Sequence, residues 1–146
     1  MLANSLSLII VAALGYGVAQ LIKFGISLRK DGLDIADLFA SGGWPSSHSA
    51  VMAATCLHIG YIEGYSSTVF GLALVVTLVV VYDSIGVRRS TGLNTLAIIK
   101  LSKKAGIKDI EHGNILGRGH TPFEVIVGLL VGVVVALLYQ TLVSQA

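Results

Sequence analysis

The chain is poor in charged residues and in cysteine, and both shortages limit what it can be. Charged residues make up 12% of its 146 positions, about half the usual share of a soluble domain. Cys56 is the only cysteine, so no disulfide forms within the chain and the redox compartment stays open. The formal net charge is only +2 and no block of Lys and Arg is present, so the composition indicates no nucleic-acid partner.

A basic amino-terminal stretch, internal repeats and low-complexity segments are missing as well. Lys23 is the first Lys or Arg of the chain, whereas a secretory signal begins with a basic region. We therefore interpret the first apolar run as a retained membrane segment. The length predicts a single domain over residues 1–146.

Long apolar runs take up most of the sequence. A helix needs roughly 20 residues to cross a hydrocarbon core, and four segments come close to this length, at about 6–28, 46–62, 68–87 and 122–142. The second is the least secure, because it is short and contains His48 and His58. In the last, Gly128 and Gly132 have the spacing that allows close helix approach. The sequence predicts an all-α integral membrane bundle of about four transmembrane helices.

The basic residues predict how this bundle is oriented. All ten Lys and Arg lie within 23–30 or 88–118, which share one side of the membrane if there are four crossings. By the positive-inside rule this active face is cytoplasmic and both termini lie on the opposite side. Lys100, Lys103 and Lys104 also share one face of a helix over 94–104, as expected of an interfacial helix in the headgroup plane. A dimer contact or a solvated surface helix is equally open.

Residues capable of chemistry gather at this same face, because successive segments alternate in direction. They are Lys23 near the end of the first segment, Pro45-Ser46-Ser47-His48 at the start of the second, Asp83, Arg88 and Arg89 at the end of the third, and His120-Thr121-Pro122-Phe123-Glu124 at the start of the fourth. No further folding assumption is needed to bring them together.

His120 and Glu124 lie four residues apart, with Pro122 suited to the first turn of a helix. A carboxylate on the same face can accept a proton from one imidazole nitrogen, which fixes the tautomer and makes the other nitrogen more basic. The plainer alternative is a glutamate favoured by the helix dipole, with the histidine merely its neighbour.

Pro45-Ser46-Ser47-His48 also begins a helix. Ser46 or Ser47 can cap it, and the free N–H groups of the first turn make an anion site. His48 can then donate a proton to a leaving oxygen. Ordinary serine capping, without further function, is the alternative.

Most of the other ionisable residues allow more than one interpretation. Lys23 and Asp83 lie at or near membrane depth, where ionisable groups are costly and indicate function, yet Lys23 can also extend to the interface. Asp83 can pair with Lys23 or an arginine, or orient a histidine. Arg88 and Arg89 suit bidentate phosphate binding or lipid headgroups, and His58 is interpreted as a packed core histidine.

These residues form the set expected for phosphoryl transfer through a histidine. A nucleophilic imidazole with a carboxylate, a second imidazole as acid, and cations with helix-end amides around the phosphate supply the required groups. The set requires neither a metal nor another cofactor. A metal site of two histidines and two carboxylates stays open, although no HExxH or comparable spacing is present.

The segments SGGWPSSHSA, VYDSIGVRR and GHTPFEVIVG resemble the divergent branch of the type 2 phosphatidic acid phosphatase superfamily, which is related to acid phosphatases and vanadium-dependent haloperoxidases. The resemblance covers most of the chain, from residue 23 to 132. Pro45-Ser46-Ser47-His48 stands where relatives have P-S-G-H, with Ser47 in place of glycine. His120 and Glu124 keep the register of the last motif, with glutamate in place of aspartate.

The resemblance implies a role for each residue. His120 is expected to be the nucleophile, Glu124 its orienter and His48 the acid for the leaving alcohol. Lys23, Ser46 and the Ser47 amide are expected to bind phosphate. Relatives carry an arginine six residues before the nucleophile, where this chain has Asn114; Arg88, Arg89 or Arg118 is expected to supply it.

The favoured hypothesis is a metal-independent membrane phosphatase acting on a lipid phosphate or pyrophosphate, with membrane lipids as its other partners. The alternatives are a non-catalytic protein that binds an anion or serves assembly, with a homo-oligomer packed through the glycine-rich last segment, and a small anion or lipid transporter. A transporter is disfavoured because the opposite face offers no matching polar site. Vanadate-dependent oxidation is the least favoured.

Overall fold

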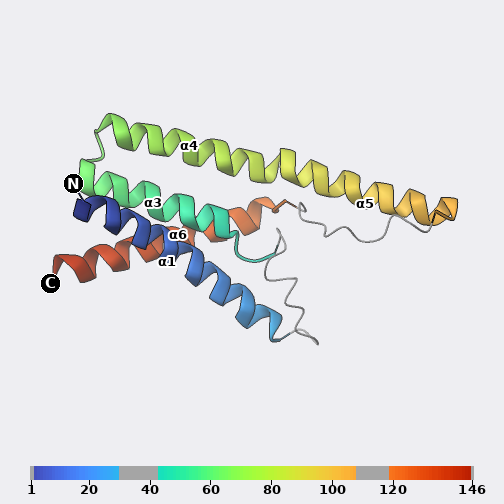
Figure 1. The fold of residues 1–146 in the computed structure, drawn as a ribbon, viewed down its shortest axis with the longest axis horizontal. Helices are drawn as coiled ribbons and strands as arrows, with labels where there is room; N and C mark the ends of the chain where they lie inside the picture. Colours follow the sequence, from blue (N-terminus) through green and yellow to red (C-terminus); the bar gives the residue numbers. More distant parts are fainter. Residues whose placement is uncertain (1, 30–42, 108–118, 146) are drawn as a thin grey trace.

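The computed structural model describes residues 2–29, 43–107 and 119–145, and within these ranges the chain is helical, without a strand. The elements are α1 (Leu2–Ser27), α3 (Ser47–Glu63), α4 (Thr68–Ile85), α5 (Val87–Ala105) and α6 (Pro122–Ser144), arranged as an elongated bundle with one projecting arm (Figure 1). The predicted all-α class is confirmed. Four of these helices begin and end close to the four predicted apolar segments.

Short polar side chains begin the helices that follow turns. Ser46, Ser67 and Thr121 are the N-caps of α3, α4 and α6, and each side chain accepts a hydrogen bond from a first-turn N–H. Pro122 is the first residue of α6, where its missing N–H loses no helical bond. These caps fix where α3 and α6 start, and two of the polar groups that the sequence singled out, at 45–48 and 120–124, lie at those two starts.

Helices α1, α3 and α6 pack around small residues, with α3 in contact with α1, α4 and α6. A Cβ on Gly15 would lie 3.2 Å from the Ala50 oxygen, and one on Gly132 would lie 2.8 Å from the Ala53 Cβ. Val11, Ala54 and Ala136 form a fully buried cluster. The close approach predicted at Gly128 and Gly132 is thereby confirmed: α6 meets the first half of α3 at these two glycines.

Replacing Gly132 by alanine is expected to destabilise the bundle, because the new methyl group would collide with the Ala50 carbonyl oxygen. Overpacking of this kind typically costs about 1–3 kcal/mol. Gly71 in α4 is the matched control, since its Cβ would meet nothing within 4 Å and alanine favours the helix by about 1 kcal/mol. Denaturation in detergent, followed by circular dichroism, should show that Gly71→Ala is more stable than Gly132→Ala. The reverse order of stability would contradict the packing.

The surface of the bundle is suited to lipid. On α4, Leu72, Val75, Leu78 and Val79 are all more than half exposed, an extent of apolar surface that a water-soluble monomer does not carry. Three described stretches are long and apolar enough to cross a membrane, at Asn4–Ser27, Thr68–Ala105 and Pro122–Ser144. The protein is therefore a membrane protein. The shorter α3, of 17 residues, lies among these helices.

The predicted basic helix is present, but it is longer than predicted and continues α4. It begins at Val87 rather than near 94, and α4 and α5 follow one another almost end to end across Gly86 (Figure 1). Among the described helices α5 contacts only α4, so Lys100, Lys103 and Lys104 belong to the projecting arm. Its placement on a membrane surface stays a prediction.

Candidate functional site

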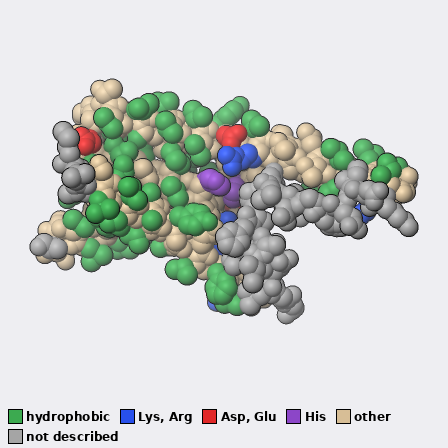
Figure 2. Space-filling model, in the orientation of Figure 1, with side chains coloured by type: hydrophobic (Ala, Val, Ile, Leu, Met, Phe, Trp, Pro, Cys, Tyr) green, Lys and Arg blue, Asp and Glu red, His purple; other side chains and the backbone are tan. Residues whose placement is uncertain are grey.

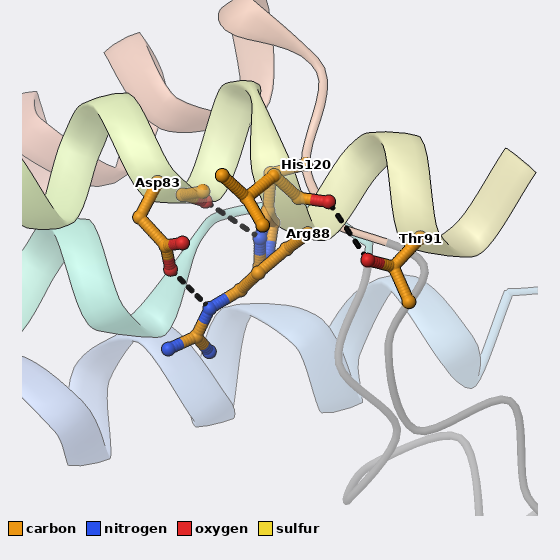
Figure 3. A network of polar contacts seen from close by, with 6 residues as sticks. Asp83, Arg88, Thr91 and His120 are labelled. Atoms are coloured by element: carbon orange, nitrogen blue, oxygen red, sulfur yellow. Dashed lines mark hydrogen bonds and ion pairs between the residues drawn. The ribbon is translucent and has the colours of Figure 1, made fainter.

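His120 lies directly before α6 and is attached to the end of α4. Its backbone N–H donates to the Ser84 carbonyl oxygen at 3.2 Å, and its Nδ1 lies 3.2 Å from the Ser84 Oγ. The side chain is almost completely buried, with 3% of its surface exposed. Its other ring nitrogen, Nε2, is buried and has no hydrogen-bond partner in the described part of the chain. One ring nitrogen is thus held, while the other has no partner among the described residues (Figure 3).

Glu124 has a different partner from the one predicted. Its Oε2 accepts a 2.8 Å hydrogen bond from the Thr121 N–H, and the Thr121 Oγ1 accepts one from the Glu124 N–H. Together they form a complete capping box at the start of α6. The predicted contact of Glu124 with one imidazole nitrogen of His120 is not among the hydrogen bonds of the described residues, and Ser84 lies at Nδ1.

Sequence reasoning missed Ser84. It lies 36 positions before His120 in the chain. It belongs to the segment VYDSIGVRR, in which only the charged residues were singled out for a role. Its neighbour Asp83 drew attention because it is charged, whereas a serine in the last turn of an apolar helix is unremarkable. Two signals were available: its place in that segment, and its place at the end of a predicted crossing segment, which puts it at the same face as His120.

The start of α3 is held against the start of α6. The Ser46 N–H donates to the Glu124 carbonyl oxygen at 3.1 Å, and the Ser46 Oγ accepts from the N–H and hydroxyl of Ser49. Ser46 is fully buried and Ser47 nearly so. Both Ser46 groups are therefore engaged within the protein, and Ser46 shapes the turn. The N–H groups of Ser47 and His48, in the first helical turn, have no intrahelical acceptor.

Asp83 pairs with Arg88. The Arg88 Nε donates to the Asp83 Oδ2 at 2.6 Å, and both side chains are partly exposed. This contact decides between the partners that the sequence left open for Asp83. It uses one edge of the guanidinium group and leaves the two terminal nitrogens for another acceptor (Figure 3).

Arg89 meets the chain that leads into α6. Gly119 adopts a positive φ of 61°, and a Cβ there would collide with the Arg89 backbone. Glycine is needed at this position for its conformation and for this close approach. Arg118, also predicted for the pocket, lies outside the described residues.

The predicted residues also influence one another electrostatically. Burial, the main cause, lowers the pKa of His120 to about 4, and the Lys23 cation acts in the same direction. The Glu124 carboxylate opposes this shift, while smaller effects of His48 and Arg88 reinforce it. The imidazole is therefore neutral at pH 7. Charged or titratable residues of α1, α3, α5 and α6 all influence this one ring.

The site lies where the apolar bundle meets its polar end. Histidine side chains lie beside blue and red ones of opposite charge, at the boundary between the hydrophobic surface and the arm (Figure 2). Trp44 and Phe123, both exposed, make an edge-to-face contact with their centroids 4.5 Å apart at the starts of α3 and α6. Within residues 2–29, 43–107 and 119–145, no three His, Cys, Asp or Glu side chains are grouped closely enough to hold a metal ion.

A buried histidine under the influence of Lys23 and Arg88, at the end of an apolar helical bundle, defines a membrane protein with a polar site at one end. Residues 4–135 match the divergent PAP2 family, and the chain belongs to this family. It is similar to the uncharacterized membrane protein YuiD of Bacillus subtilis (strain 168), with 31% identity over 135 residues that cover 82% of this chain and 84% of that protein. No solved structure matches the chain.

Proposed function

We propose that this protein is a metal-independent phosphatase that removes phosphate from a lipid phosphate or pyrophosphate through a phosphohistidine. The state of His120 carries the proposal: its ring is buried and neutral, Nδ1 is held by Ser84, and Nε2 has no partner in the described chain. Membership of the divergent PAP2 family supports it.

The reaction has two steps at His120. The Nε2 lone pair attacks phosphorus, the N–P bond forms as the P–O bond to the lipid breaks, and a protonated His48 gives its proton to the leaving oxygen. The neutral His48 then takes a proton from water, whose oxygen attacks the phosphohistidine and releases inorganic phosphate. Both imidazoles return to their starting state, so no co-reactant other than water is consumed.

The phosphate is bound by groups around this ring. Lys23 and the free edge of Arg88 offset the negative charge, and the N–H groups of Ser47 and His48 donate from the positive end of α3. Arg89 adds a further cation next to Gly119, and Ser46 shapes the α3 turn. Such donors stabilise the transition state because they are already in place before charge develops.

A lipid substrate is favoured over a soluble one by the surroundings of the site. Exposed Trp44 and Phe123 flank the starts of α3 and α6, and aromatic side chains of this kind lie at the membrane interface. The acyl or isoprenoid part of the substrate would remain in lipid, while its headgroup reaches His120.

Four membrane crossings fit this arrangement: the three long apolar stretches and, in addition, α3. Its 17 residues span roughly 25 Å, close to a hydrocarbon core of about 30 Å. With four crossings both termini lie opposite the site, and the exposed Lys100, Lys103 and Lys104 support an active face on the cytoplasmic side. Labelling of a cysteine at Lys103 by an impermeant reagent outside intact cells would overturn this orientation.

Phosphate release by purified protein in detergent tests the function. Lipid monophosphates and lipid pyrophosphates are compared with inorganic pyrophosphate and a soluble sugar phosphate, with and without EDTA. We expect release from the lipid substrates that survives EDTA. Release that EDTA abolishes, or that occurs only with the soluble compounds, would contradict the proposal. Tight phosphate or vanadate binding without turnover would instead support a protein that binds an anion.

A further inference from the structure

Ser84 holds His120 at two points. Its carbonyl oxygen accepts from the His120 backbone N–H and its hydroxyl contacts Nδ1, both at 3.2 Å. Ser84 is itself 4% exposed, in the last turn of α4. Ser84 is buried on a helix and contacts both the backbone and the ring of His120. These two contacts hold the ring in one orientation.

No carboxylate does this for His120 in the described chain. The Glu124 Oε2 is engaged at the Thr121 N–H, and Asp83 is paired with Arg88. A hydroxyl differs from a carboxylate in charge: it can accept a hydrogen bond from Nδ1–H without stabilising a positively charged ring. The neutral ring and the hydroxyl partner are therefore mutually consistent.

We propose that Ser84, rather than Glu124, is the positioning residue that keeps the proton of His120 on Nδ1 and leaves the lone pair on Nε2. The hydrogen bond made by one ring nitrogen sets the tautomer of the other. The cations of Lys23 and Arg88 help to lower the pKa of His120, so the ring carries a single proton and one of its nitrogens keeps a lone pair. The catalytic consequence rests on the proposed phosphatase function; the tautomer itself does not.

The tautomer is measured directly by ¹H–¹⁵N correlation spectra of histidine-labelled protein in detergent, with the His120 signal assigned from its loss in His120→Gln. We expect Nδ1–H in the wild type and a shift toward Nε2–H in Ser84→Ala. Glu124→Gln should leave the signal unchanged, because glutamine preserves the capping box. An unchanged tautomer in Ser84→Ala, or the same shift in Glu124→Gln, would overturn the proposal.

The chain offers a matched control in a second serine–histidine pair. The Ser7 Oγ lies 3.0 Å from the His58 Nε2, toward the other end of the bundle. Ser7→Ala should change the His58 signal and leave that of His120 unaltered, so a general loosening of the helices is distinguished from a local effect. If Ser84→Ala does not fold, Ser84→Cys keeps the volume with a weaker hydrogen-bonding group and should shift the tautomer in the same direction.

Kinetics then test the role in catalysis. We expect kcat of Ser84→Ala to fall by roughly 10²- to 10⁴-fold, as when a catalytic histidine is left in the wrong tautomer, with KM little changed. If the wild type releases no phosphate, the proposed function fails while the spectra still decide the tautomer. If the wild type is active and Ser84→Ala retains its kcat, the positioning role fails and the function stands.

Discussion

His120→Ala is expected to abolish phosphate release, with a loss of roughly 10⁴-fold or more in kcat, because it removes the atom that forms the covalent bond. Losses of this size are typical when a nucleophile is deleted and only binding and charge stabilisation remain. The ring is buried against Ser84, and truncation leaves no other described side chain in its place to attack phosphorus.

Covalent labelling separates this role from simple phosphate binding. Wild-type protein incubated with a radiolabelled lipid phosphate and quenched in alkali should retain an acid-labile phosphoramidate, and His120→Ala should retain none. His58→Gln is the matched control, since His58 is equally buried but contacts Ser7 at the far end of α3. A label that survives in His120→Ala places the nucleophile elsewhere. Transport in liposomes that survives the same substitution would support a transporter.

The fold was predictable wherever one physical requirement dominates. A lipid environment demands long uninterrupted apolar helices, so the hydrophobic runs alone locate α1, α3, α4 and α6. The spacing of Gly128 and Gly132 predicted a close helix contact, because glycine has no side chain and lets two helix backbones approach each other closely. The convergence of His48, His120 and Lys23 followed from alternating helix direction and required no knowledge of side-chain contacts.

The partners of individual polar atoms were not predictable in the same way. Glu124 is equally suited to a helix cap and to a histidine partner, and a spacing of three or four residues satisfies both. Ser84 meets His120 only through the packing of α4 beside the start of α6, which no local pattern encodes. Gly86 permits either a turn or a continued helix, and the sequence analysis, which expected a separate helix over 94–104, did not predict that α5 continues the line of α4.

His48→Ala is expected to slow release from lipid substrates by roughly 10²- to 10⁴-fold, the range for loss of a general acid. His48 is an exposed residue in the otherwise buried first turn of α3, and it is close enough to influence His120. An alkoxide is a poor leaving group and needs the proton, whereas p-nitrophenolate leaves without one. The defect in the first step should therefore be much smaller with p-nitrophenyl phosphate.

The same substitution should expose the second step. With p-nitrophenyl phosphate, His48→Ala still forms the phosphohistidine but lacks the base that activates water, so a burst of p-nitrophenol equal to the enzyme concentration should precede slow turnover. Stopped-flow absorbance measures the burst, and labelled phosphate should remain on His120. An equal loss for both kinds of substrate, without a burst, would mean that His48 binds phosphate rather than transferring protons. His48→Gln, which keeps a hydrogen-bond donor but cannot shuttle protons, would then retain activity, whereas a proton-transfer role requires it to be as impaired as His48→Ala.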